Sequence, residues 1–151
     1  MSNINMTILD WTQRSEIYKN ACHPDSIAKE KLEKALGNNE TVRFDSSLWL
    51  YEYIWNQYPE LGPCPSLSFL AKSEHSQIFN DRYRDHSTHA LKVFLLGLMF
   101  FEKNKTIKQA FIDNKINEKD FIITWIAISF WHDVGYLFEN NEINVKNIGI
   151  Y

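Results

Sequence analysis

The sequence predicts an all-α fold, and three observations lead to that class. Between positions 85 and 103 apolar residues recur at near-helical spacing, as in Leu91, Phe94, Leu95 and Leu98. Aspartate and asparagine precede several expected helices, where their side chains can accept hydrogen bonds from unpaired backbone amides. The apolar run 121–131 is long for a strand and lacks the alternation of polar and apolar residues that a strand shows.

The first predicted helices follow local start and stop signals. Pro24-Asp25-Ser26 opens a segment rich in Ala, Lys, Glu and Leu that ends at Gly37, as a capped helix does. Asp45-Ser46-Ser47 precedes a second helix over 48–58, which Pro59 stops. Residues 61–65 hold two of the four prolines and one of the five glycines, so they predict a turn, after which Ser66 can start the next helix.

Three further helices are predicted in the second half. The helix over 85–103 carries a stripe so wide, with Val93, Leu96 and Phe100 added, that it should be buried on most sides. A shorter helix follows over 106–113. Asn117 and the acidic residues after it resemble a helix start, and this last helix carries His132-Asp133.

Size and composition favour one folded domain. The 151 residues are 44% hydrophobic, which is enough for a core. A net charge of -3 and a pI near 5.9 provide no strong attraction for nucleic acid or anionic lipid, so a nucleic-acid partner is not indicated. The longest apolar stretches, 93–101 and 121–131, fall short of the roughly 20 residues of a membrane-spanning helix.

Cysteine content and the N-terminus predict a cytoplasmic protein. Cys22 and Cys64 form neither a CxxC pair nor a disulfide framework, so we expect two free thiols in a reducing compartment. Residues 1–10 are polar and mixed, unlike a signal peptide.

The histidines are the candidates for chemistry. His86 and His89 lie three residues apart, on one face of the predicted helix, and Asp85 could hold an imidazole nitrogen of His89. If this helix packs on the last one, His89 would join His132-Asp133 in a site of nitrogen and oxygen ligands. Such a site suits a divalent metal ion: Mn, Fe, Zn, Co or Ni, with Mg also a candidate. The alternative is a structural histidine oriented by its aspartate neighbour.

These residues resemble the HD-domain superfamily of metal-dependent phosphohydrolases. His89-Ala90-Leu91-Lys92-Val93 looks like the family's first-histidine helix, and Trp131-His132-Asp133-Val134-Gly135-Tyr136 looks like its His-Asp helix. The resemblance covers about 82–139 of one helical domain, 1–151. It implies an HD-like helical bundle, with His89, His132 and Asp133 as metal ligands and His132-Asp133 at the catalytic centre. The implied substrate is a nucleotide or another small phosphoester.

One part of the family pattern is missing. The family has a later aspartate, whereas this sequence has no aspartate after Asp133, only Glu139 and Glu142. Three alternatives follow: the chain is truncated at its C-terminus, a glutamate substitutes, or the site is catalytically silent. The apolar residues 148–151 favour a missing continuation.

Charged residues near the histidines are candidates for substrate binding. Arg84 and Lys92, with Arg82, could bind phosphate, or they could form an ordinary solvated face. His86 could support a second metal or simply lie near the start of its helix. A helical module that binds a ligand or protein partner without turnover is the alternative function, and the di-iron oxygenase chemistry of some relatives ranks last. The sequence predicts neither the substrate nor the oligomeric state.

Overall fold

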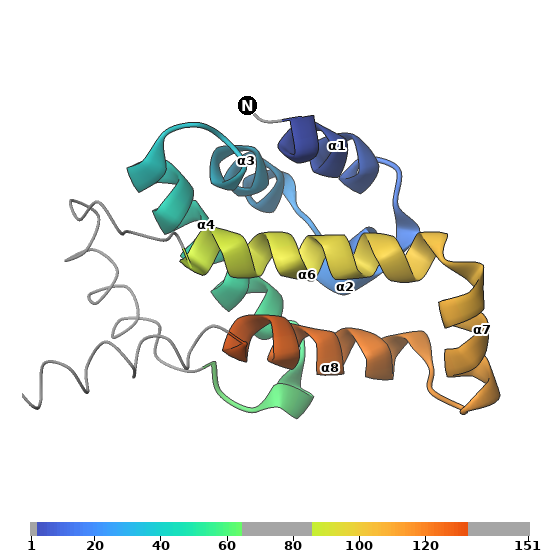
Figure 1. Cartoon of the computed structure of the whole chain (residues 1–151). Coiled ribbons are helices and arrows are strands. Elements are labelled where there is room, and N and C mark those ends of the chain that lie inside the picture. Colours follow the sequence, from blue (N-terminus) through green and yellow to red (C-terminus); the bar gives the residue numbers. More distant parts are fainter. Residues whose placement is uncertain (1–2, 65–85, 133–151) are drawn as a thin grey trace, which may run out of the picture.

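The computed structural model describes residues 3–64 and 86–132, and within these ranges every regular element is a helix. Of His86 and Trp131 only the helical backbone is described. The all-α class is therefore confirmed for the described residues. In chain order (Figure 1) the elements are α1 (Asn3–Thr12), α2 (Glu16–Cys22), α3 (Ser26–Ala35), α4 (Glu40–Trp55), the short 3-10 helix η1 (Pro59–Leu61), α6 (His86–Lys103), α7 (Lys105–Asp113) and α8 (Glu118–Trp131).

Several helices begin where the sequence predicts. The side chain of Asp25 accepts a hydrogen bond from the Ala28 amide at 2.7 Å at the start of α3. Asn117 does the same for the Asp120 amide at 2.9 Å at the start of α8. In the predicted turn, Gly62 has a φ of +73°, a conformation that favours glycine. Ser66 lies outside the described residues.

The predicted start of α4 is wrong. The helix begins at Glu40 instead of after Ser47, because Asn39 caps it by accepting from the Val42 amide at 3.1 Å. Ser47 is buried inside the helix, where its hydroxyl donates to the Arg43 carbonyl at 2.8 Å. A serine that bonds to the carbonyl four residues back is compatible with a helix interior, so its preference for helix starts misled the prediction.

The structure contains two N-terminal helices, α1 and α2, that the sequence patterns did not predict. In α1, Ile8 and Trp11 lie three residues apart and are both buried, although the surrounding sequence mixes polar and apolar residues. Asn5 is buried as well and donates to the Leu36 carbonyl at 2.7 Å. Five of the ten residues are apolar, but Ile4 and Met6 among them are more than half exposed, so the apolar positions do not mark one helix face and the periodic signal is weak.

Helix α6 is the central element of the described fold. It contacts α1, α2, α4, α7 and α8, and α3 packs on α4. Its side chains Leu91, Phe94, Leu95 and Leu98 are 0% exposed, as expected for a helix buried on most sides. The three residues expected to widen the stripe are less buried: Val93 and Leu96 are partly buried, and Phe100 is 58% exposed. Figure 1 shows α6 and α8 running antiparallel, with α7 turning the chain between them.

A close approach sets the position of α8 on α6. The indole of Trp125 lies against Gly97, where an added Cβ would be 2.1 Å from the ring. The same indole donates to the Phe94 carbonyl at 3.0 Å. Further along, Phe121 stacks on Phe101 with ring centroids 4.0 Å apart. These contacts hold the two helices in one register, so the end of α8 lies beside the start of α6.

Helix α4 supports the same end of the α6–α8 pair. Phe130, near the end of α8, packs edge-on against Tyr51 at 4.9 Å and at a tilt against Trp55 at 5.5 Å between ring centroids. On the other side, Ser47 of α4 and Thr88 of α6 place their hydroxyl oxygens 3.1 Å apart in the interior. The ends of α6 and α8 that carry the histidines are therefore anchored to α4.

The opposite end of α6 is joined to the N-terminal helices by Glu102. Its carboxylate accepts hydrogen bonds from the Trp11 indole at 2.6 Å and the Ser15 hydroxyl at 2.9 Å. The Ile17 amide, in the first turn of α2, donates to it at 3.4 Å. Partial burial raises the pKa of Glu102, but these hydrogen bonds and one from the Glu16 amide outweigh it, and the pKa lies below its usual value.

Two expectations from the sequence, on membrane-spanning helices and on free cysteines, can be compared with the described residues. Among them no helix is both long and apolar enough to cross a membrane. Cys22 is buried and Cys64 partly buried, and both are free thiols, as expected.

Candidate metal centre

Two predicted ligands from different helices lie side by side. His89 is in the first turns of α6, and His132 caps the end of α8. Their ring centroids are 5.4 Å apart and the ring planes make an angle of 50°. These residues are 43 positions apart in the sequence, and the packing of α8 along α6 brings them together.

The separation fits two imidazoles on one metal ion. With metal–nitrogen bonds of about 2.0–2.1 Å and tetrahedral angles, two ligating rings have centroids roughly 5 Å apart. The observed 5.4 Å agrees with that geometry without a movement of either helix. The last carbonyl groups of α8 also favour a cation near His132, because the C-terminal end of a helix carries partial negative charge.

The ring of His132 is oriented by its own helix. Its Nδ1 lies 2.7 Å from the backbone carbonyl oxygen of Ser129. A carbonyl only accepts, so Nδ1 carries the proton in this contact, and the neutral ring then has its lone pair on Nε2. Metal-binding histidines commonly use this arrangement. The Ser129 side chain is itself buried and donates to the Ile126 carbonyl at 3.2 Å, which holds this turn in place.

Burial does not explain the pair, because His132 and His89 are both exposed, although His132 follows the apolar run 121–131. Exposed imidazoles are hydrated and need no metal to offset burial. Support for a metal therefore comes from the proximity of the rings and the orientation of His132.

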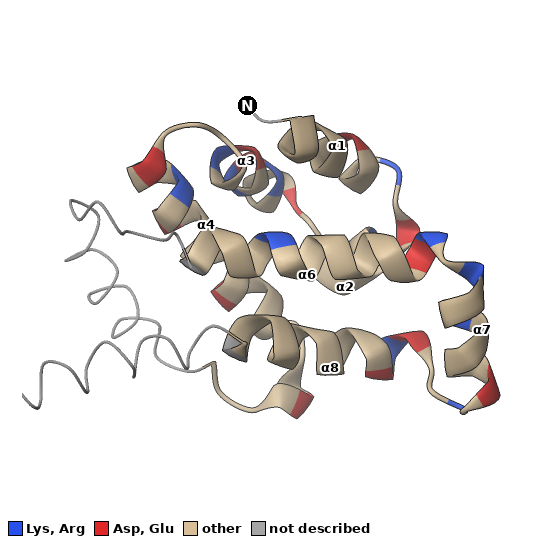
Figure 2. Ribbon diagram, viewed as in Figure 1, with Lys and Arg blue, Asp and Glu red and all other residues tan. Residues whose placement is uncertain are grey.

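Within the described parts of α6 and α8, few charged side chains lie near the two histidines. Figure 2 shows α8 with charged residues only near its start, and α6 with few before its C-terminal end. Lys92 is the lysine or arginine of α6 nearest to His89, three residues later and thus on the same face, and it is partly buried. A cationic side chain at this position can contact an anion bound near His89.

Other predicted site residues lie outside the described part of the chain. These are Asp133, the side chain of His86, and the charged residues Arg82, Arg84, Asp85, Glu139 and Glu142. Among the described residues, no group of three or more His, Cys, Asp or Glu side chains is placed to hold a metal ion. The two histidines are thus the described portion of the predicted ligand set.

Sequence reasoning missed the residues that position the histidines. Ser129 lies one turn before His132, so its carbonyl could have been identified from helical spacing alone. Gly97, Trp125 and the Ser47–Thr88 contact act between helices, and no local pattern predicts such pairs. No protein-family model matches this chain, and neither a curated protein nor a solved structure does.

Proposed function

We propose that this protein is a metal-dependent phosphohydrolase that acts on a nucleotide or another small phosphoester. The observation that carries the proposal is the 5.4 Å separation of His89 and His132, which the HD-like motif predicts to be ligands of one ion. The orientation of His132 by Ser129 adds support, because it leaves Nε2 available as a ligand.

In this proposal His89, His132 and Asp133 hold a divalent ion. Two imidazoles and a carboxylate suit Mn, Fe, Zn, Co or Ni better than Mg, which prefers oxygen ligands. When bound, such an ion supplies Lewis acidity toward a phosphoryl oxygen and lowers the pKa of water. The protein's own part is to fix both imidazoles in place, which the contacts of α8 with α6 and α4 accomplish.

Substrate binding is assigned to the cationic side chains. Lys92 shares a helix face with His89, so its ammonium group can neutralise a phosphate oxygen near the ion. Arg84 precedes α6 and would bind phosphate through paired hydrogen bonds. His86 is the candidate for a second ion.

Metal analysis with matched histidine variants tests this function. We expect the wild-type chain, loaded with Mn²⁺, Fe²⁺, Zn²⁺, Co²⁺ or Ni²⁺ and desalted, to retain about one ion or two. His89→Ala and His132→Ala should each lose it. His23→Asn is the control, because His23 is exposed just after α2 and asparagine tolerates its positive φ. Absence of retained metal in the wild type would overturn the proposal.

Measurement of hydrolysis distinguishes the phosphohydrolase from a helical module that binds without turnover. The loaded protein should hydrolyse a member of a panel of p-nitrophenyl phosphate, bis-p-nitrophenyl phosphate and nucleotides, and the two alanine variants should not. The second candidate is a helical module that binds a ligand or protein partner without turnover. That candidate predicts retained metal in the wild type with no hydrolysis of any panel member.

A further inference from the structure

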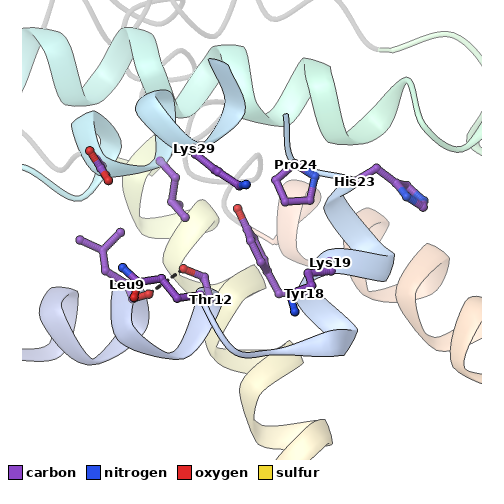
Figure 3. A pocket seen from close by; sticks show the side chains of 10 residues that line it. Leu9, Thr12, Tyr18, Lys19, His23, Pro24 and Lys29 are labelled. Carbon is purple, nitrogen blue, oxygen red and sulfur yellow. Dashed lines mark hydrogen bonds between the residues drawn. The ribbon is translucent and has the colours of Figure 1, made fainter. Parts of the chain in front are cut away.

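Helices α1, α2 and α3 enclose a pocket on a different part of the protein. Its volume is about 480 Å³, within the usual range of small-molecule sites. Leu9 of α1, Leu32 of α3 and Pro24, which precedes α3, provide apolar walls. Leu9 and Pro24 are labelled in Figure 3. None of the residues that line it belongs to α6 or α8.

The hydroxyl group of Tyr18 points into this pocket (Figure 3). Tyr18 as a whole is only 4% exposed, its side chain lines the pocket, and no hydrogen bond of its hydroxyl to another described residue is found. Nearby tyrosines differ: the Tyr58 hydroxyl donates to the Ala21 carbonyl at 2.9 Å, and that of Tyr53 donates to the His23 carbonyl at 2.8 Å. A hydroxyl that faces a pocket without a protein partner can donate to a bound molecule, so the Tyr18 hydroxyl is a candidate contact for a ligand.

Tyr18 remains a hydrogen-bond donor at ordinary pH. Burial raises the pKa of its phenol well above the usual value, and the nearby Cys22 and Tyr53 raise it further. A protonated phenol surrounded by protein donates readily to an anionic oxygen.

One cation of the pocket is available to a ligand. The side chain of Lys29 extends toward the pocket in Figure 3 and forms no ion pair within the described part of the chain. By contrast, Lys19 pairs with Glu16 at 2.6 Å, and Lys34 pairs with Glu30. Glu33 also lines the pocket, so the lining favours a ligand of low negative charge.

We propose that the pocket between α1, α2 and α3 binds a small organic monocarboxylate with a short apolar body. One carboxylate oxygen accepts from the Tyr18 hydroxyl and the other from the Lys29 ammonium group. The apolar body lies against Leu9, Pro24 and Leu32. A phosphate dianion is disfavoured, because its second charge would face Glu33 while the other lysine of the lining, Lys19, already pairs with Glu16.

Titration of the full chain followed by two-dimensional amide NMR tests this site with 4-phenylbutyrate as the probe. We expect saturable shifts in α1, α2 and α3. The neutral analogue 4-phenylbutanamide should bind at least about tenfold more weakly, as expected when a charged hydrogen bond is lost. Phenyl phosphate should also bind more weakly than the carboxylate.

Variants of exposed lining residues give opposite expected effects. Lys29→Met should weaken 4-phenylbutyrate binding about tenfold, whereas Glu33→Gln should strengthen it severalfold. Lys34→Met is the control on the same helix and should bind as the wild type does. Tyr18→Phe should weaken binding severalfold and keep the fold, since only an oxygen is removed. Equal binding of the amide, tighter binding of phenyl phosphate, or shifts confined to other helices would overturn the proposal.

Discussion

Trp125 occupies the space that a side chain at position 97 would need. A Cβ on Gly97 would lie 2.1 Å from its indole, and the indole nitrogen donates to the Phe94 carbonyl at 3.0 Å. This contact aligns α8 on α6, and the alignment brings His132 beside His89. The candidate metal centre therefore depends on a glycine eight residues away from its first histidine.

Gly97→Ala should destabilise the protein although alanine is the better helix former. The clash forces Trp125 out of place, with a net loss of about 1–3 kcal/mol in the free energy of unfolding. Urea unfolding measures this value. Ala110→Ser, an exposed change on α7, should remain within about 0.5 kcal/mol of the wild type. A Gly97→Ala protein as stable as the wild type would show that the two helices are not in this register.

Phe130→Ala should remove the contacts of α8 with α4. Phe130 is 6% exposed and packs on Tyr51 and Trp55, so its truncation should cost about 3–5 kcal/mol. Ile128→Ala is the matched control on the same helix. Ile128 is 50% exposed, and its truncation should cost less than about 1 kcal/mol in the same unfolding measurement. Similar losses for both variants would contradict the described packing.

Asn39→Ala should destabilise the start of α4. The lost cap should cost about 1 kcal/mol, because the Val42 amide then has no side-chain partner. Asp45→Ala lies inside the same helix and should have little effect on thermal unfolding. A larger loss of stability for Asp45→Ala than for Asn39→Ala would contradict the described start of α4 at Glu40.

Glu102 should contribute to stability above acidic pH. Its pKa is lower in the folded protein than in the unfolded chain, where it is about 4.3. Its contribution is therefore fully present above that unfolded value and is lost as the pH falls through the lower folded value. Glu102→Gln keeps an acceptor but removes the charge.

Unfolding of wild type and Glu102→Gln across the acidic range measures this contribution. We expect the wild type to be more stable near neutral pH, by less than about 1 kcal/mol after solvent screening. The difference between the two proteins should disappear in strong acid. A constant difference at every pH would mean that the charge of Glu102 plays no part.

Metal binding should raise the melting temperature through the two histidines. An ion at one hundred times its Kd stabilises the folded state by about 2.7 kcal/mol. Thermal unfolding with added Zn²⁺ or Mn²⁺ should show this rise for the wild type and for His23→Asn. His89→Ala and His132→Ala should show none. A rise retained in both alanine variants would place the ion elsewhere.

Sequence patterns were most informative where a helix is long or its cap is local. The broad apolar stripe predicted α6, and Asp25 and Asn117 marked helix starts, because their hydrogen bonds reach only three residues. The same kind of signal failed for α4, where Ser46 and Ser47 are buried inside a helix. Helix α1 was not predicted, because its apolar residues are partly exposed and its buried side chains contact helices that are distant in the sequence.

The sequence by itself determined the all-α class of the described residues and most helix starts in the second half. It also singled out His89 and His132 as candidate ligands. Each of these depends on neighbours within one or two turns. Only the tertiary structure decided that His89 lies 5.4 Å from His132, that both are exposed, and that Ser129 orients one of them. The physical reason is packing: the register of α8 on α6 depends on Trp125 against Gly97 and Phe130 against α4, and such contacts between distant segments leave no periodic pattern in the sequence.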